Sequence, residues 1–276
     1  MIAVYQLTYL ARTTASAQEY FEYIDLLTSV LRHPAPQVRP FTIVEVGCGF
    51  CFLTVSALLA VRRQLGEGAL LRFLSLDASE EMLARCRQQL VDNGVDVSLG
   101  TVALGAVVAS SETAVVGFAN PGNYGGNVGG VSVEGPPAPR DRAAEREVPA
   151  TTLTRLLEGV GGSDGGGIID LLDVDVQGSE GDAFDTHMDV LDRRVKLVHV
   201  GSHGTLHRVR EPLFAEGNEV ERAVLAAFDA HGWTRRFIFP RTSMHCEPSV
   251  FAATPFGPVC FADGVLSFEN PRLAGK

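Results

Sequence analysis

Three short segments of this 276-residue chain carry side chains that suit ligand binding, and each follows an apolar run. The first, VEVGCGFC at residues 44–51, leads from a hydrophobic strand through a glycine turn into a helix. Gly47 and Gly49 have no side chain, so the backbone there can approach a ligand closely. Glu45 supplies a carboxylate at the end of the strand. The segment therefore predicts a ligand site at a strand-to-helix turn.

The start of the following helix narrows the choice of ligand. A dinucleotide fingerprint has a third glycine at this point, which lets a pyrophosphate lie against the helix N-terminus. Here Cys51 and Phe52 occupy that region. This difference disfavours an NAD(P)-dependent oxidoreductase and favours a ligand without phosphates, such as S-adenosylmethionine. The ligand's ammonium group would then face Glu45, directly or through water.

The second and third segments end two further strands. Asp77 ends the strand predicted at residues 70–76, and its two oxygens suit the two hydroxyls of an adenosine ribose. The third segment, DLLDVDVQGSE at residues 170–180, becomes acidic at its carboxyl end. By strand alternation Asp173 and Asp175 point to the same face, whereas Asp170 is expected on a solvated edge. Asp173, Asp175 and Glu180 together could hold a divalent metal, but we expect none.

The pattern of apolar runs predicts an α/β fold with a Rossmann-like, mostly parallel sheet of seven strands and helices on both faces. Short buried strands alternate with amphipathic helices, which is typical of βαβ units. A final β stretch is expected at residues 249–253 and 259–261, and this last pair of strands, adjacent in the sequence, is expected to be antiparallel. The strands and helices expected between residues 41 and 239 are strands 41–46, 70–76, 95–102, 115–118, 168–176, 195–200 and 236–239, and helices 52–65, 79–90, 153–157, 180–191 and 218–231.

Two divisions of the chain follow from composition. Residues 1–40 are expected to form a helical cap, because Ser16 and Glu19 make a capping box ahead of an apolar stripe. The stripe consists of Tyr20, Ile24, Leu27 and Leu31, and it is widened by Tyr23 and Val30. The helix could serve as a lid or as an additional core helix. Residues 41–276 are expected to form the main domain, with a flexible insertion at about 119–147 that is rich in glycine and proline.

Charge and cysteine content exclude several classes of partner. The formal net charge is −10, and no basic stripe appears, so we expect no nucleic-acid partner. We see no apolar run long enough for a membrane span. Five cysteines in a chain of this size indicate reduced thiols and a cytoplasmic location. His199, inside an apolar strand, is expected to be a hydrogen-bonded core histidine.

Taken together, these segments resemble the FkbM family of class I methyltransferases. The resemblance covers about residues 41–273, and it also includes VPATTL at residues 148–153 and VHVGSH at residues 198–203. It implies a seven-stranded Rossmann-like domain that uses S-adenosylmethionine, usually as an O-methyltransferase. The chain differs from the family pattern at Asp173, where a lysine is usual, and at Thr154 and Cys51.

The resemblance also implies roles for particular residues. Asp175 and Gln177 would lie near the transferred methyl group. Apart from the resemblance, the positions of His203 and Asp175 at strand ends make either one a candidate for the general base that removes a proton from the acceptor. Asn120 and Tyr124 lie in a loop rich in glycine and asparagine, which could bind that acceptor, a small molecule with a hydroxyl group, or could be a plain surface loop. The residues implied for the rest of the cofactor are Glu45, Gly47, Cys48 and Gly49 at the methionine end, Asp77 and Ala78 at the ribose, and Val102 and Ala103 at the adenine. A catalytically inactive binding module with the same fold stays an alternative.

Overall fold

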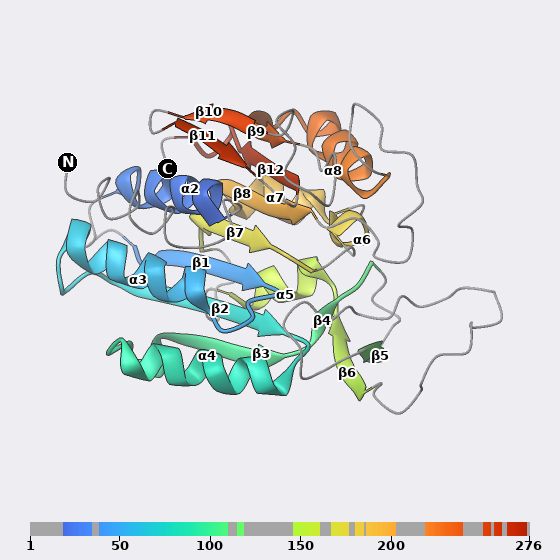
Figure 1. Ribbon diagram of the computed structural model, residues 1–276. Helices are drawn as coiled ribbons and strands as arrows, with labels where there is room; N and C mark the ends of the chain where they lie inside the picture. The colour runs from blue at the N-terminus through green and yellow to red at the C-terminus, as the bar shows by residue number, and fades with distance from the viewer. Residues whose placement is uncertain are drawn as a thin grey trace.

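A computed structural model describes most of the chain (Figure 1). The described residues are 19–34, 39–109, 115–118, 146–160, 167–176, 180–184, 186–202, 219–239, 251–254, 257–260 and 264–274.

The centre of the molecule is a seven-stranded sheet with the order β3-β2-β1-β7-β8-β12-β9. β12 is antiparallel to both of its neighbours, and the pairings from β3 to β8 are parallel. The seven strands are β1 Phe41–Val46, β2 Leu71–Asp77, β3 Gly100–Leu104, β7 Leu171–Val174, β8 Leu197–Ser202, β9 Thr234–Phe239 and β12 Gly264–Glu269.

Helices cover both faces of this sheet, and each face has its own apolar cluster. On one face α2, α3 and α4 pack against the odd-numbered residues of β1, such as Ile43. On the other face α5, α6, α7 and α8 pack against the even-numbered residues, such as Val44. The helices are α2 Glu19–Leu31, α3 Phe52–Leu65, α4 Glu80–Asp92, the 3-10 turn η1 Val97–Leu99, α5 Leu153–Gly159, α6 Glu180–Phe184, α7 Met188–Arg194 and α8 Glu219–Ala230.

The predicted fold class is confirmed, with one correction at the end of the chain. The two segments expected to close the chain are antiparallel to each other as predicted, but they form a separate pair, β10 Phe251–Thr254 and β11 Gly257–Cys260. The antiparallel strand of the main sheet is instead β12, which inserts between β8 and β9. The helix expected at 180–191 is also two helices, because the chain turns between Phe184 and His187.

A second small sheet lies beside the carboxyl end of β3, at the lower right of Figure 1. It consists of β4 Ala106–Val107, β6 Arg146–Thr151 and β5 Val115–Phe118, in that order. β5 and β6 flank the expected insertion at 119–147. All but the last two residues of that insertion lie outside the described part of the chain.

The expected N-terminal helix is present as α2, and its predicted apolar stripe is correct in part. Tyr23 and Val30, expected to widen the stripe, join the core beneath the helix, as does Leu26, which was not predicted. Leu31, expected in the stripe, is exposed. α2 also buries a carboxylate, Asp25. Of the two alternatives, this packing supports an additional core helix. The division of the chain at residue 40 stays a prediction.

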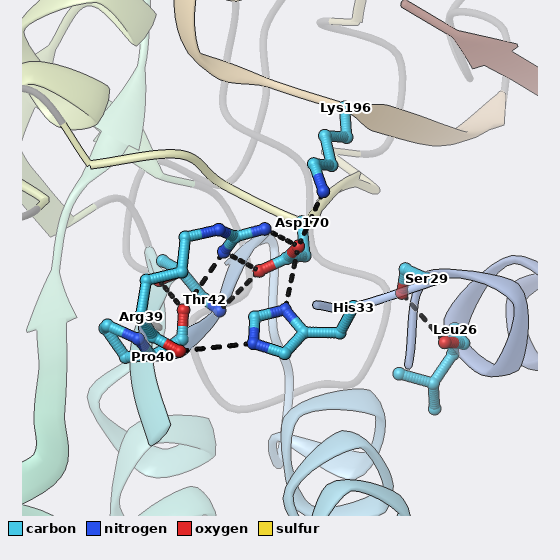
Figure 2. Close-up of polar contacts among 8 residues, drawn as sticks. All are labelled: Leu26, Ser29, His33, Arg39, Pro40, Thr42, Asp170 and Lys196. Carbon is cyan, nitrogen blue, oxygen red and sulfur yellow. Dashed lines mark hydrogen bonds and ion pairs between the residues drawn. The ribbon is translucent and has the colours of Figure 1, made fainter. Parts of the chain in front are cut away.

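The prediction that Asp170 lies on a solvated edge is wrong, because its side chain is 1% exposed. Figure 2 shows Arg39, His33 and Lys196 converging on it. Arg39 donates from both terminal nitrogens, at 2.7 and 2.5 Å, and the Thr42 backbone N–H donates at 3.0 Å. Burial alone would raise the pKa of Asp170, but the bonds from Arg39 and His33 hold it below its ordinary value.

Asp170→Asn is expected to destabilise the protein by about 3–5 kcal/mol at pH 7, because it leaves the half-buried Arg39 without its counter-charge. A carboxyl group whose pKa is lowered by folding stabilises the fold above its ordinary pKa. That stabilisation is lost as the pH falls through the folded pKa. Urea unfolding should therefore show the difference between wild type and variant narrowing below about pH 4.

The exposed Arg235–Asp229 pair provides a matched control. Asp229→Asn should cost about 1 kcal/mol or less. Equal effects of the two substitutions at pH 7 would contradict a structural role for the buried pair.

Candidate functional site

The glycine turn after β1 is held between the ends of two neighbouring strands. Gly47 has φ +85°, and a Cβ atom on it would lie 1.7 Å from the backbone oxygen of Asp175. The backbone N–H groups of Gly47 and Cys48 both donate to the oxygen of Leu76, at 2.8 and 3.0 Å. Gly47 is therefore needed both for its dihedral angle and for the close approach of β7.

Asp77 joins this turn to the end of β2. Its Oδ2 accepts from the backbone N–H of Gly49 at 2.8 Å, and its Oδ1 accepts from Ser79 N–H at 2.7 Å. Burial raises the pKa of Asp77, although both hydrogen bonds lower it. A carboxylate oxygen has a second lone pair, so each can still accept from a ligand hydroxyl. Ala78 is partly buried and follows directly.

Asp175 lies just beyond β7, between the ends of β1 and β8. Its backbone N–H donates to Val46 at 2.9 Å. Its carboxylate lies against Gly201, where an added Cβ would be 3.2–3.4 Å from side-chain atoms of Asp175. Four neighbouring strands thus bring their carboxyl ends together, which is where open α/β sheets bind ligands. Gly201 was not singled out in the sequence, although its place at the end of a buried strand could have indicated it.

Glu45 is buried rather than open to this edge. It is 4% exposed, and its Oε2 accepts from the backbone N–H of Thr54 at 3.1 Å and from the Thr54 hydroxyl at 2.5 Å. Burial raises the pKa of Glu45 to about 8. The carboxyl group is therefore mostly neutral at pH 7 and holds the first turn of α3. Its contact with a ligand ammonium group stays a prediction.

Glu45 belongs to a row of polar side chains that crosses one face of the sheet. The β-sheet register aligns, in order, Ser75, Glu45, Asp173, His199 and Ser267. Asp173 is buried beneath α2, and burial together with Glu22 and Glu45 raises its pKa well above the ordinary value. The prediction for His199 is confirmed, since it is buried and its Nδ1 lies 2.9 Å from Asp25 Oδ2.

A disulfide joins Cys51 to Cys86 next to the glycine turn, so the prediction that all cysteines are reduced is wrong for this pair. Cys51 is the N-cap residue of α3 and has the left-handed value φ 61°, which is uncommon for a residue other than glycine. The free thiol of Cys48 lies 3.6 Å from Cys51 Sγ. The pairing was not visible in the sequence, because it depends on α3 and α4 lying side by side.

The roles of the other predicted site residues stay predictions. Val102 and Ala103 were expected after the third strand, but they lie within β3, which ends at Leu104. Their contact with an adenine stays a prediction. The remaining predicted residues, Gln177, His203, Asn120 and Tyr124, lie outside the described residues.

Comparison with known proteins identifies the class. A model of the methyltransferase FkbM domain matches residues 48–226, and the chain belongs to this family. No curated protein matches the sequence. No helix in the described part of the chain is long and apolar enough to cross a membrane.

Solved structures with a similar arrangement share little sequence with this chain. Precorrin-6y C5,15-methyltransferase from Geobacter metallireducens GS-15 is 12% identical, with 90% of this chain and 85% of that chain covered and a TM-score of 0.41. Magnesium protoporphyrin IX methyltransferase from Synechocystis PCC 6803, solved with bound S-adenosylmethionine, is 10% identical, with 92% and 79% covered and a TM-score of 0.44.

Glu45→Gln is expected to stabilise the protein increasingly as the pH rises from about 5 to 8. A carboxyl group whose pKa is raised by folding binds more protons in the folded than in the unfolded state, so stability falls with pH between its two pKa values. The free energy of unfolding of the wild type should fall by up to about 1.4 kcal/mol per pH unit relative to that of the variant. Thermal unfolding across this range measures it, with exposed Glu81→Gln as control. A constant difference would contradict the buried, neutral Glu45.

Cys86→Ala is expected to lower the free energy of unfolding by about 3–4 kcal/mol in the absence of reductant. The reason is that the bridge closes a loop of 35 residues and so restricts the unfolded chain. Most of this difference should disappear in reductant, because the wild type then loses the same bridge. Denaturant unfolding under both conditions tests it. Cys48→Ala, which removes a free thiol, should show no such dependence. A Cys86→Ala effect that reductant leaves unchanged would argue against the bridge.

Proposed function

We propose that this chain is an S-adenosylmethionine-dependent O-methyltransferase that acts on a hydroxyl group of a small molecule or sugar. The observation that carries the proposal is the 2.8 Å hydrogen bond from Gly49 N–H to Asp77. It brings the turn expected at the methionine end next to the carboxylate expected at the ribose. Both ends of one donor molecule would thus meet side chains at one sheet edge.

The charge at this edge supports a cationic ligand. Asp77 and Asp175 lie close enough that the charge of Asp175 raises the pKa of Asp77. Two carboxylates attract a sulfonium and repel a pyrophosphate. The turn also has Cys51 where a dinucleotide site has glycine. The residues therefore fit S-adenosylmethionine better than NAD or NADP.

The chain's own residues would orient the reactants and accept a proton. When bound, S-adenosylmethionine supplies an electrophilic methyl group. The turn at Gly47 and Gly49 holds the amino-acid end, and Asp77 accepts hydrogen bonds from the ribose. Asp175 or His203 removes the proton of the acceptor hydroxyl as the new bond forms, and Asn120 and Tyr124 hold the acceptor. Glu45 acts by positioning, since it holds Thr54 at the start of α3.

Ligand-dependent thermal stability tests the choice of cofactor. We expect S-adenosylmethionine and S-adenosylhomocysteine to raise the melting temperature, and NAD and NADP to leave it unchanged. Asp77→Asn should abolish the shift, because it removes one acceptor oxygen at the ribose. Asp92→Asn, on the exposed face of α4, should retain it. A shift with NAD alone would contradict the proposal.

Single-turnover methylation of candidate hydroxyl acceptors tests the reaction. Replacing the general base should slow transfer by about 10²-fold or more while cofactor binding persists. Asp175→Asn and His203→Ala are the two variants to compare. Normal rates in both would reject both residues as the base. Cofactor binding without any transfer would instead indicate a binding module.

A further inference from the structure

Three side chains from distant parts of the chain converge beneath α2, next to the sheet edge described above. Glu22 comes from α2, Asp173 from β7 and His199 from β8. One ligand atom from each lies within 4.8 Å of the others, and Glu22 Oε1 is 4.0 Å from His199 Nε2. Asp173 is 4% exposed and His199 is fully buried. The group thus combines two carboxylates and an imidazole in a nearly dry interior.

Two atoms of this group are unsatisfied. Asp173 Oδ1 and His199 Nε2 are buried and have no hydrogen-bond partner among the described residues. A buried carboxylate is costly unless it is paired or coordinates a metal. Asp175 and Asp25 add to the negative charge around Asp173. Arg236 lies nearby, and its Nε donates to Asp25 rather than to Asp173.

His199 is already oriented in the way that a metal ligand requires. Its Nδ1 lies 2.9 Å from Asp25 Oδ2, and Arg236 Nε holds the other oxygen of Asp25 at 3.0 Å. Histidines that bind metals almost always donate the second ring N–H to a carboxylate, a carbonyl or water, which fixes the ring and its tautomer. With the proton on Nδ1, the lone pair of His199 Nε2 faces Glu22 and Asp173.

We propose that Glu22, Asp173 and His199 bind a divalent transition-metal ion, of the kind represented by Zn²⁺ or Mn²⁺. Ligand bonds of about 2 Å place two donors at most about 4 Å apart, so the 4.0 Å separation of Glu22 and His199 is at the outer limit. The side chain of Glu22 is flexible, so a small rotation can shorten the distance between its carboxylate and His199. Carboxylates with one imidazole suit both ions. The ion would fasten α2 to β7 and β8.

This site differs from the metal set weighed from the sequence, and it does not depend on the proposed methyl transfer. Of that set only Asp173 takes part. Asp175 lies beyond β7 against Gly201, and Glu180 begins α6, which packs on the opposite face of the sheet. The acids of α2 supply the other ligand and the partner of His199. The sequence analysis expected no metal, but it considered only acids between residues 173 and 180 as ligands and none from α2.

Mn²⁺ binding tests the site independently of enzyme activity. It also avoids interference from the nearby cysteines, because Mn²⁺ prefers oxygen ligands to thiolates. Full-length protein is stripped with chelator and titrated with Mn²⁺, and the free ion is followed by electron paramagnetic resonance. We expect one ion per chain and a higher melting temperature with Mn²⁺ or Zn²⁺. Asp173→Asn and His199→Gln should each weaken binding by about tenfold or more.

The surface pair His231–Asp192 provides the matched control, since His231→Gln removes an imidazole bound to a carboxylate elsewhere. It should leave Mn²⁺ binding unchanged. If the variants at Asp173 and His199 fail to fold, Glu22→Gln is the variant to test instead, because Glu22 is the most exposed of the three residues. No binding by the wild type up to roughly 1 mM Mn²⁺ or Zn²⁺ would overturn the proposal. So would unchanged binding in folded Asp173→Asn or Glu22→Gln.

Discussion

The close contact between Gly47 and the backbone of Asp175 is the constraint on which the geometry of the site depends. No side chain fits at Gly47, where the Cβ position is 1.7 Å from a carbonyl oxygen. The contact holds the turn after β1 against the end of β7, while hydrogen bonds to Leu76 hold it against β2. Asp77 and Asp175 consequently lie on either side of the turn. The position of these two acids at the sheet edge is therefore a result of backbone packing.

The buried acids of the sheet are stabilised in different ways. Asp170 is fully paired with Arg39 and its neighbours, and its pKa is lowered. Glu45 is satisfied by Thr54 and is mostly neutral, with a pKa of about 8. Asp173 has neither a described cation nor a full set of hydrogen bonds. This contrast within one sheet is the reason to assign a cation to Asp173 and to its neighbours beneath α2.

The features that the sequence predicted correctly are contiguous along the chain. The glycine turn and Asp77 each lie where a strand becomes a turn, so local pattern was enough to find them. Pairings between distant segments were not visible. The sequence does not show that Asp170 meets Arg39, that Cys51 meets Cys86, or that the strand Gly264–Glu269 inserts next to β8.

The most direct test of the central claim is a crystal structure with S-adenosylhomocysteine. The account predicts the ribose hydroxyls within hydrogen-bonding distance of Asp77, and the amino-acid end over the turn at Gly47 and Gly49. The sulfur should then face the edge beside Asp175. A nucleoside bound elsewhere, or with Asp77 out of reach of the ribose, would contradict the account.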